Sequence, residues 1–172
     1  MFENNLNKGL LLDRDGVINE EAGYIWKREL FQFREGVLDL IRVATNLSYK
    51  IIVITNQGGI AKNLYTHTQL ADLHTYMRKK IAQAGGRVDK IFYCPHHPEF
   101  GMCLCRKPQT LFFERAIAQF NLCSSNTWMV GDKARDLMPA QWLGIKTALV
   151  AQDDFKADLT LNHPGELIPF LN

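Results

Sequence analysis

Short apolar runs alternate with longer amphipathic segments along this chain of 172 residues. The runs are almost continuously apolar, as strands are when helices cover both faces of a sheet. The segments between them repeat apolar residues at helical spacing, as Val37, Leu40, Ile41 and Ala44 do within residues 36–47. This alternation predicts βαβ units, and therefore an α/β fold with a mainly parallel sheet.

The boundaries of the expected elements follow from the same alternation. Strands are expected at residues 9–13, 51–55, 91–94, 127–131 and 147–150. Helices are expected at 36–47, 68–84, 110–120 and 134–143, the last ending before Gly144. Residues 158–172 are expected to add a short edge strand and a short helix. The chain length and the lack of repeats or linkers predict one domain, residues 1–172.

Composition argues against several classes of protein. With 47% hydrophobic and 22% charged residues the chain can build a core, so general disorder is not expected. A net charge of +2 is too balanced to indicate nucleic-acid binding, and no apolar run approaches the roughly 20 residues that span a bilayer. The N-terminal sequence MFENNLNKGLLLDRDG is not that of a secretory signal. We expect a cytoplasmic monomer without nucleic-acid or membrane partners.

Polar residues follow several predicted strands at the ends where parallel strands share one edge. DRDG at 13–16 follows the first strand, TNQ at 55–57 the second, and GDKARD at 131–136 a later one. Ligands of open parallel sheets bind outside the carboxyl ends of the strands. We therefore expect these groups to form one site.

The residue types at these strand ends suit phosphoryl chemistry. Asp13 and Asp15 can hold a hard cation, or divide the roles of nucleophile and general acid/base. Arg106 and Lys107 form an anion clamp. Each motif also has a simpler interpretation: an acidic turn at 13–16, an ordinary turn at 55–57, a solvated basic pair at 106–107, and a helix N-cap at Asp132. Together the motifs favour metal-assisted phosphoryl transfer.

Three of the four cysteines fall within residues 94–105, in the pattern C-x-H-x₆-C-x-C. Thiolate and imidazole ligands at this spacing suit a closed tetrahedral site of structural type and favour Zn²⁺, although reduced buried cysteines are the alternative. The candidate ligands are Cys94, Cys103 and Cys105 with either His96 or His97. Because Cys105 directly precedes Arg106, a structural zinc would fix the loop that presents the anion clamp. Cys123 lies far along the chain and is expected to be an ordinary thiol.

The ordered motifs DRDGV, TNQ, RKP and GDKxxD resemble the four motifs of the haloacid-dehalogenase-like (HAD) phosphatases, over residues 13–136. The resemblance implies a three-layer Rossmann-like core. The modest length leaves room for this core and the small zinc-binding loop at 94–105, but not for a large cap domain. The resemblance implies that Asp13 is the nucleophile that forms an aspartyl-phosphate, that Asp15 is the general acid and base, and that Thr55 and Lys107 hold the phosphoryl oxygens. The implied Mg²⁺ ligands are Asp13, Asp132 and the main-chain carbonyl of Asp15, with Asp136 as an outer support.

Within this family, DRDGVIN, AGY, TNQGGIA, CPHHP and MVGDK are most similar to the zinc-loop members that act on heptose bisphosphate in lipopolysaccharide precursor synthesis. The match implies His96 as the fourth zinc ligand. The substrate-binding residues that it implies are Glu21, Ala22, Gly23, Tyr24, Thr55, Asn56, Gln57, Gly58, Arg106, Lys107 and Lys133. Only six residues separate His96 from Cys103, as in members that act on histidinol phosphate, and Gly58 stands where serine is common. Histidinol phosphate or another small phosphomonoester is therefore the alternative substrate, and a catalytically silent phosphate-binding module is the alternative of another class.

Overall fold

Six strands form one sheet in the computed structural model, which describes residues 6–151 and 155–171. Their order is β3-β2-β1-β4-β5-β6, and every neighbouring pair is parallel. The strands are β1 (Asn7–Leu12), β2 (Lys50–Asn56), β3 (Lys90–Cys94), β4 (Leu122–Gly131), β5 (Lys146–Leu149) and β6 (Leu159–Thr160). The chain builds outward from β1 to β3 and then crosses to the other side of β1. The boundary between β1 and β4 is therefore the switch point at which open α/β sheets bind ligands.

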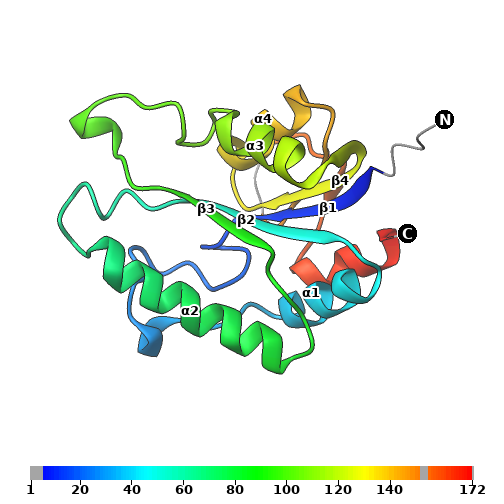
Figure 1. Ribbon diagram of the computed structural model, residues 1–172, viewed down its shortest axis with the longest axis horizontal. Coiled ribbons are helices and arrows are strands. Elements are labelled where there is room, and N and C mark those ends of the chain that lie inside the picture. Colours follow the sequence, from blue (N-terminus) through cyan, green and yellow to red (C-terminus); the bar gives the residue numbers. More distant parts are fainter. Residues whose placement is uncertain (1–5, 152–154, 172) are drawn as a thin grey trace.

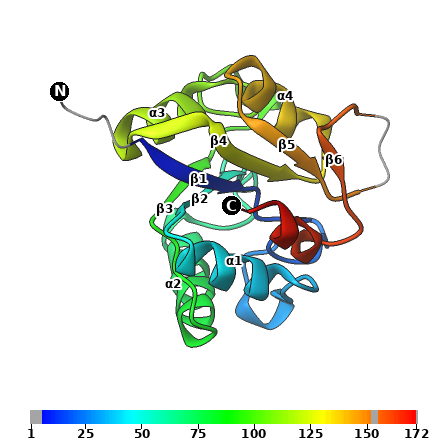
Figure 2. The same ribbon diagram turned by 90° about the vertical axis from the view of Figure 1, so that its right-hand side faces the viewer.

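Helices cover both faces of this sheet, which confirms the three-layer α/β prediction. The α-helices are α1 (Val37–Asn46), α2 (His67–Gln83), α3 (Leu111–Phe120) and α4 (Ala134–Trp142). The 3₁₀ helices are η1 (Arg28–Leu30), η2 (Pro98–Phe100) and η3 (Pro164–Phe170). Figures 1 and 2 show α1, α2 and η3 on one face and α3 and α4 on the other, in agreement with two separate apolar clusters.

The side chains of β1 show why the strands are continuously apolar. Leu10 and Leu12 pack in the cluster that contains α1 and α2, whereas Leu11 packs in the cluster that contains α3 and α4. None of the three leucines has any exposed surface. Because side chains alternate between the faces of a strand, a strand covered on both sides needs apolar residues at every position. Burying each leucine stabilises the fold by about 1.5–3 kcal/mol.

The predicted boundaries agree with the structure within two residues except at the start of β4. That strand begins at Leu122 rather than at Thr127, and its pairing with β1 shifts between Asn7–Leu122 and Gly9–Thr127. Residues 123–126, three of which are polar, occupy this irregular stretch, so the apolar pattern alone does not detect it. The edge strand and short helix expected after residue 158 are β6 and η3.

The loops after β2 and β3 project from the carboxyl edge of the sheet, at the left of Figure 1. They are residues 57–66 and 95–110, and among the described residues no separate cap domain accompanies them. No helix in the described part of the chain is long and apolar enough to cross a membrane. Residues 1–5 begin the N-terminal segment that we do not expect to be a secretory signal, and they lie outside the described residues.

Candidate active site

A buried lysine connects the residue after β1 with the last part of β2 and the first turn of α4. The Nζ atom of Lys107 lies 2.8 Å from Oδ1 of Asp13, directly after β1, and 2.9 Å from Oδ1 of Asp136 in α4. It also donates to the main-chain oxygen of Ile54 in β2 at 2.7 Å. Lys107 is only 2% exposed, so the solvated-face interpretation is wrong for this residue. All three of its N–H groups have partners, and a phosphoryl oxygen would have to exchange with one of them.

Three carboxylates cluster at this point, and two of them, Asp13 and Asp136, pair with the ammonium group of Lys107. Asp13, Asp132 and Asp136 each offer an oxygen within 4.8 Å of the others. Burial raises the pKa of Asp13 to about 7; Lys107 opposes the shift and Asp136 adds to it. Burial likewise raises the pKa of Asp132 to about 6, with a further contribution from Asp136. Burial disfavours the charged form of Lys107, but Asp13 and Asp136 outweigh it and raise the pKa of this lysine.

The three side chains of Asp13, Asp132 and Asp136 form a carboxylate centre that fits a hard divalent cation. Oδ1 of Asp132 is buried and has no hydrogen-bond partner among the described residues. Gly16 has a φ of 83°, and a Cβ atom there would contact the Asp132 carboxylate, so the backbone after Asp15 can pass this close only as glycine. An oxygen-rich, negatively charged and incompletely bonded cluster is what Mg²⁺ requires.

Asp132 does not cap α4, so the N-cap alternative is wrong. The cap position is Lys133, whose main-chain N–H donates to Oδ2 of Asp136 at 3.2 Å. The side chain of Asp132 instead lies beside those of Asp13 and Asp136. Asp136, expected only as an outer support, therefore holds both Lys107 and the start of α4.

Asp15 is held by four donated hydrogen bonds. Arg14 donates from Nε at 3.1 Å and from Nη2 at 2.7 Å to Oδ1, which also accepts from Asn19 at 3.1 Å. Gln57 donates to Oδ2 at 2.9 Å. Arg14 has no exposed surface, and its Nη1 lies 3.5 Å from Nε2 of His74. Burial, with help from Arg14, lowers the pKa of His74 to about 3, so this histidine is neutral.

Gln57 connects Asp15 to the rest of the predicted TNQ motif. Its Nε2 also donates to Oγ1 of Thr55 at 2.8 Å, and its Oε1 accepts from the hydroxyl of Tyr65 at 2.6 Å. Burial raises the pKa of Tyr65 to about 12, which keeps this hydroxyl a donor. The motif is therefore part of a buried network rather than only a turn. Tyr65 belongs to no motif, and sequence reasoning missed it.

A cavity of about 290 Å³ opens beside these groups. The predicted residues that line it are Asp13, Asp15, Glu21, Gly23, Tyr24, Thr55, Asn56, Gln57, Gly58, Arg106 and Lys107. Ile25, Tyr65, His97, Arg135 and Asp136 also line it and were not predicted as substrate-binding residues. Ala22 and Lys133 are not among the lining residues. Lys133 instead forms ion pairs with Glu21 at 2.9 Å and with Asp132 at 3.5 Å.

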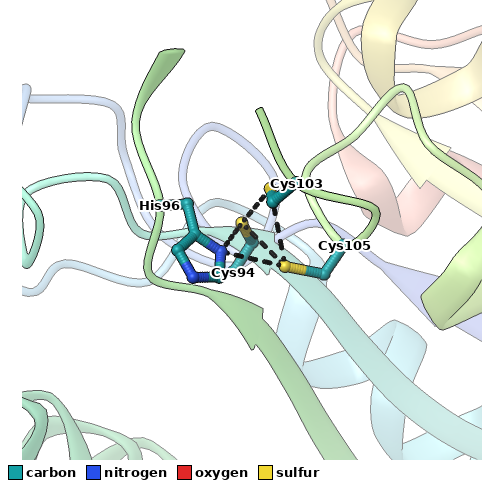
Figure 3. A group of neighbouring side chains, drawn as sticks. All are labelled: Cys94, His96, Cys103 and Cys105. Atoms are coloured by element: carbon teal, nitrogen blue, oxygen red, sulfur yellow. Dashed lines mark hydrogen bonds between the residues drawn. The ribbon is translucent and has the colours of Figure 1, made fainter. Parts of the chain in front are cut away.

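The predicted thiolate and imidazole group assembles above β3 (Figure 3). Its sulfur–sulfur distances are 3.1, 3.6 and 3.7 Å, and Nδ1 of His96 lies 3.6 Å from Sγ of Cys94 and 3.3 Å from Sγ of Cys105. A tetrahedral zinc with zinc–sulfur bonds of about 2.3 Å separates its ligands by roughly 3.5–3.8 Å. No disulfide joins these cysteines. The group therefore has the shape of a closed four-ligand site, and His96 rather than His97 completes it.

The Cys/His cluster is joined directly to the carboxylate centre. After Cys105 the chain reaches Arg106, whose Nη1 donates to the main-chain oxygen of His96 at 3.0 Å. The next residue, Lys107, exchanges two hydrogen bonds with the side chain of Asn56, at 3.0 and 3.1 Å. The loop that presents Lys107 is therefore held by the cluster on one side and by the end of β2 on the other.

Comparison with known proteins agrees with this geometry. The HAD-hydrolase-like family model matches residues 104–169. A D-glycero-beta-D-manno-heptose-1,7-bisphosphate 7-phosphatase from Haemophilus ducreyi is 37% identical and covers 96% of this chain and 98% of its own. The chain belongs to the HAD phosphatase family.

Two further relatives of this phosphatase are informative. A D-glycero-alpha-D-manno-heptose-1,7-bisphosphate 7-phosphatase from Burkholderia mallei is 34% identical, with 96% of this chain and 94% of that protein covered. The crystal structure of a D,D-heptose 1,7-bisphosphate phosphatase from B. bronchiseptica, complexed with magnesium and phosphate, superimposes with a TM-score of 0.86 at 30% identity. That superposition covers 95% of this chain and 97% of the other.

Proposed function

We propose that this phosphatase removes the 7-phosphate of D-glycero-D-manno-heptose 1,7-bisphosphate in the cytoplasm, during synthesis of ADP-heptose for lipopolysaccharide. The observation that carries the proposal is the buried group of Asp13, Asp132, Asp136 and Lys107 at the switch point of the sheet. Relatives named for this substrate align along almost the whole chain, which supports the choice of sugar phosphate.

The residues divide the reaction into two steps. Asp13 attacks the phosphorus atom and forms an aspartyl-phosphate, while Asp15 gives a proton to the leaving sugar oxygen. Water then attacks the phosphorus atom of the aspartyl-phosphate while Asp15 takes a proton from it, and the bond to Asp13 breaks, which releases inorganic phosphate and restores the Asp13 carboxylate. Gln57 and Arg14 hold Asp15 at one position through both steps. Lys107 holds Asp13 and balances charge as the phosphoryl group approaches.

Two metal sites are part of the proposal. Asp13, Asp132 and the main-chain carbonyl of Asp15 would hold Mg²⁺, which when bound neutralises the phosphate dianion and offsets its repulsion by Asp13. Cys94, His96, Cys103 and Cys105 would hold Zn²⁺, which fixes the loop and takes no part in the chemistry. The near-tetrahedral spacing of these four ligand atoms supports the zinc assignment.

Substrate selection rests on short loops in this proposal. Glu21 and Tyr24 line the cavity on one side, and Gly58 and Arg106 line it on the other. Arg106 offers a planar pair of donors suited to a phosphate group. The cavity of about 290 Å³ is small, which favours a sugar-sized substrate.

The ratio of kcat/KM values for two substrates tests the proposal. We expect heptose 1,7-bisphosphate to exceed histidinol phosphate by at least about 100-fold with Mg²⁺ present. The six-residue segment between His96 and Cys103 and the glycine at position 58 are the features that leave histidinol phosphate as the alternative, and a reversed ratio would assign that activity instead. Measuring the alpha and beta anomers separately decides between the two kinds of relative. Phenyl phosphate serves as a control: no hydrolysis of any of these esters would indicate a silent binding module.

A further inference from the structure

His97 lies at the rim of the active-site cavity, and the proposed reaction leaves it unused. His97 is one of the residues that line this cavity, as are Gly58 and Arg106, and its side chain is 18% exposed. The neighbouring His96 enters the Cys/His cluster (Figure 3). The two consecutive histidines therefore point to different sites, one to the thiolates and one to the substrate cavity.

Hydrogen bonding fixes which edge of the His97 ring is a donor. Nδ1 accepts from the main-chain N–H of Glu99 at 3.3 Å, so the neutral ring carries its hydrogen on Nε2. The Glu99 carboxylate lies 3.8 Å from Nδ1 and pairs with Lys62 at 3.0 Å. Nε2 also carries a hydrogen in the charged imidazolium, so this atom is a donor in either state. None of the described residues is hydrogen-bonded to Nε2.

Gly58 is the surface on which this ring rests. A Cβ atom at position 58 would lie 2.9 Å from Cδ2 of His97 and 3.2 Å from Nη1 of Arg106. Cδ2 is bonded to Nε2, so the donor edge of the ring is the edge next to Gly58. Both distances are shorter than ordinary van der Waals contact, and any larger residue would push the two side chains away. The absence of a side chain at position 58 therefore brings two hydrogen-bond donors side by side.

The position of His97 is fixed by contacts between two loops. Lys62 from the loop after β2 pairs with Glu99 in η2, and Ala61 donates its N–H to the oxygen of Pro95 at 3.2 Å. Arg106 is fixed in turn by its bond to the oxygen of His96. The two donors thus belong to a preformed rim, as expected of groups that select a ligand.

We propose that His97 is a specificity residue: Nε2–H of His97 and the guanidinium of Arg106, seated on Gly58, together bind the phosphate group that Asp13 does not attack. This inference rests on the proposed function, because only a bisphosphate has such a second group. A planar guanidinium and a neighbouring N–H donor are complementary to adjacent oxygens of one phosphate.

Kinetics with two substrates test the role of His97. For heptose 1,7-bisphosphate we expect His97→Ala to lower kcat/KM by about 10- to 100-fold, mainly through KM, since a hydrogen bond to a charged group is lost. The loss for phenyl phosphate, which has no second phosphate, is expected to be at least about fivefold smaller. His97→Gln keeps an N–H donor and should recover part of the loss. His67→Ala, at the exposed start of α2, is the matched control and should match the wild type with both substrates.

A double-mutant cycle tests whether the glycine at position 58 is what allows His97 to act. Gly58→Ala should lower kcat/KM for the bisphosphate by about tenfold when His97 is present and by clearly less in the His97→Ala background. Additive losses, or equal losses for both substrates, would overturn the proposal. So would loss of zinc in His97→Ala without recovery in His97→Gln, because the effect would then belong to the cluster.

The same measurements separate this inference from the proposed function. A wild-type enzyme with no preference for the bisphosphate over phenyl phosphate would overturn both. A wild-type preference that survives His97→Ala would overturn only the role of His97.

Discussion

The two metal-ligand groups of this protein are neighbours with opposite properties. In the carboxylate centre, oxygens of Asp13, Asp132 and Asp136 lie within 4.8 Å of one another. Burial raises the pKa values of Asp13 and Asp132, and one oxygen of Asp132 has no hydrogen-bond partner among the described residues. The Cys/His cluster instead directs four ligand atoms at one another, 3.1–3.7 Å apart along the measured edges. One group is open to a cavity and electrostatically incomplete, whereas the other is closed.

The difference shows how the protein separates chemistry from support. Buried like charges cost stability, and a site that tolerates them retains groups able to react. A closed four-ligand site has no free position for a substrate, and therefore acts through the loop that it holds. The segment from Cys105 to Lys107 connects the two groups, so a change in either can reach the other.

The largest expected effect is the loss of the nucleophile. Asp13→Asn should lower kcat by about 10⁴-fold or more, because an amide cannot form the aspartyl-phosphate. The fold should persist, because the amide has the size of the carboxylate and keeps an oxygen that can accept from Lys107, which also remains paired with Asp136. Steady-state turnover and circular dichroism measure the two expectations. Asp39→Asn on the exposed face of α1 is the control; retained turnover in Asp13→Asn would assign the chemistry elsewhere.

A change in the Cys/His cluster should lower stability strongly and turnover less than the loss of Asp13 does. Cys105→Ala should abolish zinc binding, lower the melting temperature and reduce kcat/KM by about 10- to 100-fold through displacement of Arg106 and Lys107. Turnover that remains should still depend on Mg²⁺. Cys123→Ala, outside the cluster, should change none of these quantities. Elemental analysis that finds no zinc in wild-type protein would contradict the assignment.

A smaller effect concerns pH and magnesium. Asp13 has a folded pKa raised to about 7, so the stability linked to its protonated form is present at low pH and lost as pH rises through 7. Mg²⁺ binds the ionised carboxylates, and should therefore raise the melting temperature more at pH 8 than at pH 6. At 100 times its Kd it contributes about 2.7 kcal/mol, or roughly 5–10 °C. Thermal unfolding with and without MgCl₂ checks this, and Asp132→Asn should remove most of the increment.

The smallest expected effect lies in the network behind Asp15. His74 has a folded pKa of about 3, below its usual 6.5, so the unfolded chain binds more protons between these values and stability falls as pH drops below 6.5. Glutamine does not titrate, so the free energy of unfolding of His74→Gln should fall by about 1 kcal/mol less than that of the wild type between pH 6.5 and 5.5. Denaturant unfolding at both pH values measures it, with the exposed His67→Gln as control. Parallel curves for wild type and His74→Gln would show that His74 titrates normally.

The sequence pattern predicts the parts of the molecule that have a regular spacing of residues. The strands were predictable because side chains such as Leu10, Leu11 and Leu12 must all be apolar between two helical layers. Asp13 and Asp132 were predictable as neighbours because parallel strands share their carboxyl edge. The spacing of the cysteines likewise predicted the cluster that the structure contains.

Other features depend on contacts between loops, which no periodicity records. The pattern CPHHP alone leaves open which histidine joins the cysteines. In the structure His96 contacts Cys94 and Cys105, whereas His97 packs beside Gly58 and accepts from the N–H of Glu99. Tyr65 joins the network through Gln57, from a loop without a motif. The first part of β4, before Thr127, pairs irregularly with β1 and lacks the apolar pattern of a strand. Lys107 was recognised from its motif, but its three existing partners were not.

The most direct test of the carboxylate centre is to trap the phosphorylated enzyme. Asp15→Asn should slow hydrolysis of the aspartyl-phosphate, since it removes the base that activates water. Acid quench during turnover of phenyl phosphate, whose phenolate leaves without the proton that Asp15 gives to a sugar oxygen, followed by peptide mass spectrometry, should then find one phosphoryl group on the peptide that contains Asp13, and none in the Asp13→Asn/Asp15→Asn double variant. A phosphoryl group on another residue, or direct hydrolysis with no adduct, would contradict Asp13 as the nucleophile.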